Sequence, residues 1–145
     1  MRLTRRALLA LPLGALGAQS QDQTDFLRAL EPLASALSYQ EAGEPSASGD
    51  VGRQVDAFGA GLTKDFPARE NLLLAIEALL RIVFITSSIV VLRVENGVAD
   101  VDWLMDMRQK GRRVSDRRRE RLNVEIRDGK VSKITPVTFF RLPGT

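Results

Sequence analysis

The pattern of apolar residues changes after Arg81, and this change limits the fold more than any other feature of the chain. Before it, apolar residues recur every three or four positions over residues 22–40 and 67–80, a spacing that predicts amphipathic helices. A shorter helix is expected over residues 51–58, because Asp50 can cap its start and glycines follow its end. The first 80 residues therefore predict helices.

The rest of the chain has the composition of β-strands. Residues 82–94 are dense in β-branched side chains and stop near Asn96-Gly97, a pair that accepts the positive φ angles of a two-residue hairpin turn. Asp128-Gly129 is a second turn of this kind. The expected strands cover residues 82–94, 99–108, 117–127 and 131–140. Helices followed by a four-stranded antiparallel meander, without βαβ crossovers, predict the α+β class, with N-terminal helices packed on a curved, cone-like sheet.

The first turn sets which strand residues share a face of the sheet. A two-residue turn at Asn96-Gly97 places Arg93 opposite Asp100 and Val91 opposite Asp102 on one face. The other face is expected to cover the helices, and it consists of Val90, Leu92, Val101, Trp103, Met105, Leu122, Val124 and Ile126. The polar face carries Arg93, Asp100, Asp102, Asp106, Arg117, Arg119 and Arg121.

Residues 1–18 have the order of a secretory signal: arginines without an acid, an apolar run from Ala7 to Leu16, then small residues. The run falls well short of the roughly 20 apolar residues that a transmembrane helix needs. Arg5 and Arg6 resemble the pair of a twin-arginine signal. We therefore expect an exported, periplasmic or extracellular protein whose single domain covers residues 19–145. Only the leader, before its cleavage, is expected to meet the membrane.

Beyond its leader the chain is formally neutral, with 18 basic and 18 acidic side chains, so a globally cationic nucleic-acid binder is not indicated. The charge is polarised: residues 19–107 hold 6 basic and 14 acidic side chains, whereas residues 108–145 hold 12 and 4. The chain has no histidine and no cysteine, which excludes serine–histidine triads, thiolate nucleophiles, disulfides and most transition-metal sites. No cofactor or metal is expected.

The helices, the long meander and parts of three strands resemble the nuclear-transport-factor-2-like superfamily, which includes ketosteroid isomerases and SnoaL-type cyclases. The matching segments are Val98 to Trp103, the arginine-rich third strand, and the ending from Val131 to Phe140. The resemblance implies a cone closed by helices, often with a pocket in its mouth, and frequently a homodimer. It implies no activity by itself. Dehydratase members use a histidine, which this chain lacks, and isomerase members use a pocket aspartate with a tyrosine, whereas Tyr39 is the one tyrosine here. No catalytic residue is carried over.

Two clusters of charged residues have both a functional and a structural interpretation. Asp100, Asp102 and Asp106 have a spacing that suits acid–base or metal chemistry. A ladder of cross-strand ion pairs is favoured instead, with Arg93, Arg119 and Arg121 as the partners. The basic residues between positions 108 and 121 suit an anionic polymer. No aromatic residue is interleaved with them, so a solvated, partly ion-paired hairpin is favoured there.

A ligand pocket would lie inside the cone. Its expected lining, with two inward polar groups near the mouth, is Trp103, Met105, Met107, Arg118, Glu120 and Phe139. Aromatic residues and methionines at strand spacing are also typical of plain core. Glu120 is the favoured functional acid, because strand alternation sends it inward with Leu122. A lyase or isomerase that uses Glu120 and Tyr39 is therefore an alternative function.

The preferred interpretation is an exported, non-catalytic domain that binds a small apolar ligand or a protein partner. The register places Ile89, Val91 and Leu104 next to one another on the polar face, where they form an apolar spot with a charged rim. Apolar spots on soluble proteins often mark contacts. A homodimer through the sheet is therefore expected.

Overall fold

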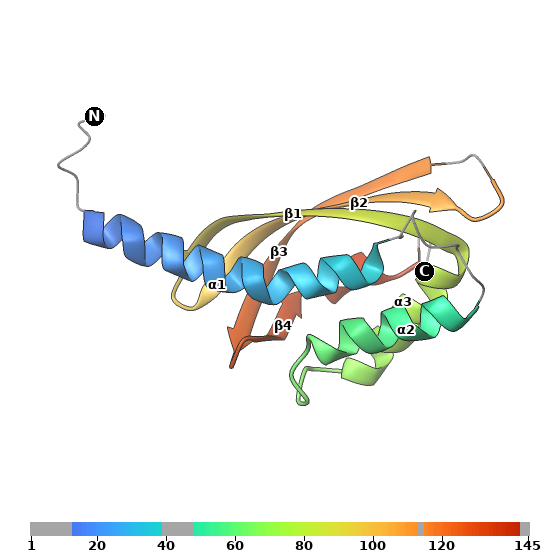
Figure 1. Ribbon diagram of the computed structural model, residues 1–145, viewed down its shortest axis with the longest axis horizontal. Coiled ribbons are helices and arrows are strands. Elements are labelled where there is room, and N and C mark those ends of the chain that lie inside the picture. Colours follow the sequence, from blue (N-terminus) through green and yellow to red (C-terminus); the bar gives the residue numbers. More distant parts are fainter. Residues whose placement is uncertain (1–12, 39–47, 113–114, 143–145) are drawn as a thin grey trace.

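Three helices precede a four-stranded sheet in the computed structural model, which describes residues 13–38, 48–112 and 115–142. The helices are α1 (Leu13–Leu37), α2 (Ser48–Ala60) and α3 (Arg69–Ile82). A short 3-10 helix, η1 (Val137–Phe140), follows the strands, which are β1 (Val83–Glu95), β2 (Val98–Gln109), β3 (Ser115–Arg127) and β4 (Lys130–Thr135). Each strand pairs antiparallel with the next, in the order β1-β2-β3-β4. The predicted α+β class is confirmed (Figure 1).

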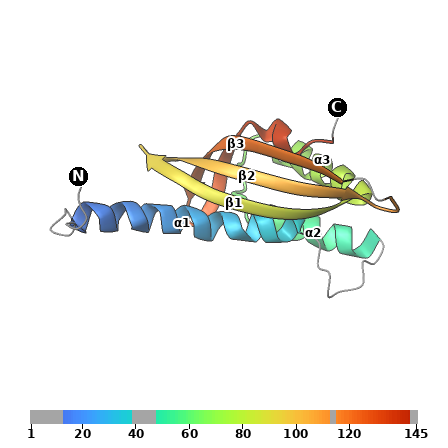
Figure 2. The same cartoon turned by 90° about the horizontal axis from the view of Figure 1, so that it is seen from above.

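Helix α1 lies along the first strand and forms one wall of the core. Its buried stripe has the three- and four-residue spacing read from the sequence and consists of Phe26, Leu30, Leu33 and Leu37. At the end of α1, Ser38 forms a bridge with Ile85 of β1. Two perpendicular views show α1 beside β1, with its first turns extending past the sheet (Figures 1 and 2).

Helix α1 begins at Leu13, inside the segment expected to be the leader. Among residues 21–38, the first buried side chain is Phe26, so the described core contacts of α1 belong to the expected mature domain. No described helix is long and apolar enough to span a membrane. Export and cleavage stay predictions.

The connection between α2 and α3 pairs with the free edge of β4. The Val131 N–H donates to the Gly61 carbonyl oxygen at 2.9 Å, and the Thr63 N–H donates to the Val131 carbonyl oxygen at 2.9 Å. A methyl group on Gly61 would stand 2.4 Å from Cδ1 of Leu33, so glycine allows the end of α2 to approach α1 closely. Helix α2 starts at Ser48, before the expected range of 51–58.

Both predicted hairpin turns form, with φ angles of 54° and 78° at Asn96 and Gly97 and of 54° and 77° at Asp128 and Gly129. The predicted register holds for Arg93, which faces Asp100, and then fails because a β-bulge lies between Val91 and Arg93. The bulge adds one residue to β1, so every residue before it changes face.

The bulge corrects the expected inner and outer faces of β1. Ile89 faces Trp103 and, like Val91, packs against the core, whereas both were expected on the polar face. Val90 and Leu92 were expected in the core, but they are 51% and 40% exposed. On the other strands the expected core residues are buried or half-buried, namely Val101, Trp103, Met105, Leu122, Val124 and Ile126.

Strand β4 is shorter than the expected range of 131–140. It ends at Thr135, and Pro136, which has no N–H to donate to a strand ladder, follows it. The chain then turns through η1, which sends Phe139 and Phe140 into the core. Because Phe139 and Phe140 are consecutive and both buried, strand alternation could not have placed them together.

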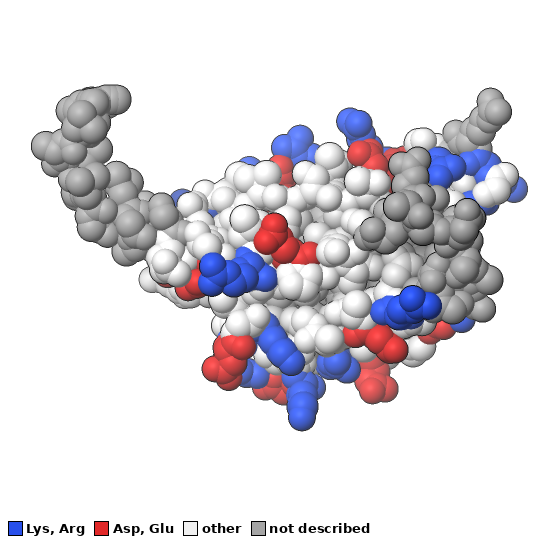
Figure 3. All heavy atoms as spheres, viewed as in Figure 1, with Lys and Arg blue, Asp and Glu red and all other residues white. Residues whose placement is uncertain are grey.

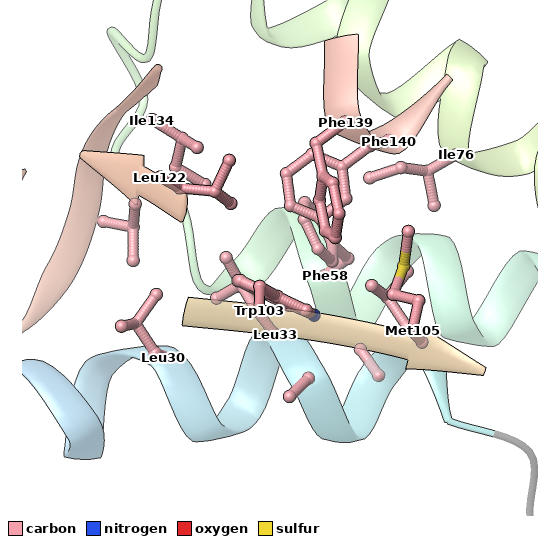
Figure 4. Close-up of a cluster of buried hydrophobic side chains, with 14 of the residues drawn as sticks. Leu30, Leu33, Phe58, Ile76, Trp103, Met105, Leu122, Ile134, Phe139 and Phe140 are labelled. Carbon is pink, nitrogen blue, oxygen red and sulfur yellow. The ribbon is translucent and has the colours of Figure 1, made fainter. Parts of the chain in front are cut away.

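An aromatic cluster occupies the centre of the core. The Trp103 ring lies 5.2 Å from the Phe140 ring and 6.1 Å from the Phe139 ring, and Phe58 of α2 meets Phe140 at 5.7 Å, all measured between ring centroids. Figure 4 shows these side chains converging from the sheet, from η1 and from α2. The concave side of the sheet is thus packed against the helices through large side chains.

Candidate functional site

The apolar residues expected to line a pocket lie in the hydrophobic core. Trp103 and Met105 have no exposed surface, and Phe139 and Met107 are 1% and 3% exposed. The indole N–H of Trp103 donates to Oγ of Ser87 at 3.5 Å, which gives its single polar group a partner. Their burial agrees with the interpretation of these residues as ordinary core residues. A role for them in ligand binding stays a prediction.

The two polar residues expected at the pocket mouth have different surroundings. Nη1 of Arg118 donates to the carbonyl oxygens of Phe139 and Arg141, at 2.7 Å and 2.6 Å. Arg118 therefore fixes the end of η1. Glu120 is half-buried and faces Trp103 in the register between β2 and β3. Tyr39 lies outside the described residues, so catalysis by Glu120 and Tyr39 stays a prediction.

The strand aspartates form the ladder of ion pairs that the sequence favours. Nη2 of Arg119 lies 2.6 Å from Oδ2 of Asp102, and Nε of Arg93 lies 3.6 Å from Oδ2 of Asp100. Asp106 pairs at 2.7 Å with Arg117, which was not among the expected partners, whereas Arg121, which was, faces Asp102 in the register. Among the residues that the structure describes, no group of carboxylates could hold a metal ion. The ion pairs therefore account for the aspartate spacing.

The hydrogen bond from Arg119 lowers the pKa of the Asp102 carboxyl below its ordinary value. The carboxylate thus gains a partner on folding, and its contribution to stability is present above the unfolded-state pKa of about 4. That contribution is lost as the pH falls through the lower folded-state pKa.

We expect Asp102→Asn to lower the free energy of unfolding by at most about 1 kcal/mol at pH 7, because exposed ion pairs contribute little. The difference from wild type should shrink as the pH falls below about 4. Urea unfolding at both pH values measures it. A difference that is several times larger at pH 7, or that does not change with pH, would contradict this account.

Phe84 belongs to a site that sequence reasoning does not single out. Cζ of Arg108 and Nζ of Lys110 each lie 5.1 Å from the centroid of its ring. Phe84 faces Arg108 across β1 and β2. This register depends on the bulge near Leu92, so the turn at Asn96-Gly97 could not reveal the contact.

Comparison with known proteins found no match to this chain. The resemblance to the nuclear-transport-factor-2-like superfamily therefore stays a prediction that rests on the order of elements. No protein-family model matches the chain, and neither a curated protein nor a solved structure matches it.

Proposed function

We propose that this protein is an exported, non-catalytic domain that binds a protein partner, and that its first partner is a second copy of itself. The observation that carries the proposal is the exposure of Val90 and Leu92, at 51% and 40%, on strand β1. These two side chains replace Ile89 and Val91 in the expected apolar spot. Leu104, one strand away, is half-buried.

The charges around this spot favour self-association. Asp100, Asp102 and Asp106 are each paired with an arginine of the same chain. The paired surface has little net charge to repel an identical surface, and the ion pairs would form a polar rim around an apolar centre. A two-fold axis would bring the same patch of both copies together.

A protein partner fits the geometry better than a small apolar ligand does. The side chains expected to line a pocket, from Trp103 to Phe139, pack against one another and against the helices. Exposed apolar side chains on a strand, by contrast, are available to another protein without rearrangement of the core.

We expect wild type to be a dimer at micromolar concentration and Val90→Glu to weaken the dimer at least about tenfold, because each copy would bury a charge without a partner. Light scattering across a dilution series measures the change. Leu74→Glu is the matched control, because Leu74 is 63% exposed on α3, outside the proposed contact, and its variant should dimerise as wild type does. A monomeric wild type, or a dimer that survives Val90→Glu, would refute the proposed contact.

A further inference from the structure

A groove of about 620 Å³ lies at the base of the hairpin that joins β2 and β3. It is lined by Phe84, Thr86, Asp106, Met107, Arg108, Ser115, Asp116 and Arg117. Blue side chains gather near this end of the molecule, at the upper right of Figure 3. The groove is therefore a polar hollow next to the most basic part of the chain.

Phe84, which lines the groove, contacts two cations through its aromatic ring. Arg108 and Lys110 both lie 5.1 Å from the ring centroid of Phe84, so the two positive charges are within about 10 Å of each other, near one Debye length at physiological salt. A cation–π contact orients a cation without cancelling its charge. Arg108 has no ion pair among the described residues, unlike the arginines of the ladder.

Both acids of the groove contact Arg117, which also lines it, and Asp116 keeps its negative charge because its partner there is a backbone N–H. Asp106 accepts a hydrogen bond from Nε of Arg117 at 2.7 Å, and Oδ1 of Asp116 accepts one from the Arg117 N–H at 2.9 Å. Neither contact neutralises Arg108. The hydroxyl groups of Thr86 and Ser115 add hydrogen-bond donors to the lining.

We propose that this groove binds a phosphate or sulfate group, with the Arg108 guanidinium as its principal partner. A guanidinium presents parallel N–H donors that match two oxygens of such a group. Lys110 lies at the same distance as Arg108 from the Phe84 ring and places a second cation beside the groove. The ligand carries its oxyanion either as a free ion or as a repeating group of an anionic polymer.

The test follows the backbone amides of the purified protein by NMR while phosphate, sulfate or polyphosphate is added at low ionic strength. We expect shifts at Phe84, Thr86 and Ser115, and binding that weakens as salt is added. Arg108→Gln should weaken binding at least about tenfold. The affinity of Arg108→Lys should lie between those of this variant and wild type, because lysine keeps the positive charge but lacks the parallel N–H donors of the guanidinium.

Arg121→Gln is the matched control. Arg121 is exposed, lies on β3 opposite Asp102, and does not line the groove, so its loss removes the same charge and should change the affinity less than about twofold. Equal effects of the two glutamine variants would overturn the proposal, because they would indicate a general attraction to a positive surface. The absence of shifts at about 10 mM of each anion would also overturn it. Tighter binding of polyphosphate per phosphate would assign the site to a polymer, and equal binding would assign it to the free ion.

Discussion

Replacing Trp103 with alanine is expected to lower the free energy of unfolding by about 3–5 kcal/mol, the usual loss for truncating a large buried aromatic residue. Trp103 has no exposed surface and contacts both Phe139 and Phe140. Its removal would leave a cavity where β2, η1 and α2 meet, and it would leave the Ser87 hydroxyl without its indole partner. A domain of this size has a stability of only about 5–15 kcal/mol, so much of it would be lost.

Circular dichroism in urea measures this loss, because Trp103 is the one tryptophan and its replacement removes the fluorescence signal. Leu74→Ala serves as the control. Leu74 is 63% exposed, so its truncation should change stability by less than about 0.5 kcal/mol. A loss below about 1 kcal/mol for Trp103→Ala would mean that the tryptophan lines an open space, as the pocket interpretation requires.

The order of the elements could be predicted because each helix, strand and turn depends on residues that are close together in the sequence. The buried stripe from Phe26 to Leu37 and the glycine turns depend on residues only a few positions apart. The bulge in β1, by contrast, does not depend on neighbouring residues alone. Ile89 to Leu92 are four consecutive apolar residues, so alternation cannot tell which two face the core. A shift of one residue in the register determines which two face the core, and that shift follows from the packing of β1 against α1 and β2.

The candidate site shows the same division between local and long-range information. The sequence correctly predicted that Trp103 and Met105 lie on the inner face of the sheet. It could not reveal which side chains pack against that face. Phe58 comes from α2, and Phe140 comes from a segment expected to continue a strand. The contact of Phe84 with Arg108 likewise joins two strands whose register depends on the bulge.

Arg118 has a structural contact that its sequence interpretation did not include. Its expected place at a pocket mouth stays a prediction, and the structure shows that it joins β3 to the C-terminal segment through hydrogen bonds to Phe139 and Arg141. Hydrogen bonds that involve a charged group typically contribute about 1.5–3 kcal/mol. Phe139 and Phe140 are core residues held in place partly by this guanidinium.

We therefore expect Arg118→Gln to lower the free energy of unfolding by about 1.5–3 kcal/mol and to loosen the chain after Pro136 first. Trp103 fluorescence in urea measures the stability, since the indole contacts both phenylalanines of η1. Hydrogen exchange measures the local effect at the Arg141 N–H, which donates to the Thr138 carbonyl oxygen at 3.1 Å. Arg119→Gln, the neighbouring variant with the same loss of charge, removes only an exposed ion pair and should leave that amide protected. If both variants expose the Arg141 amide equally, the effect comes from the charge of β3 and not from the hydrogen bonds of Arg118.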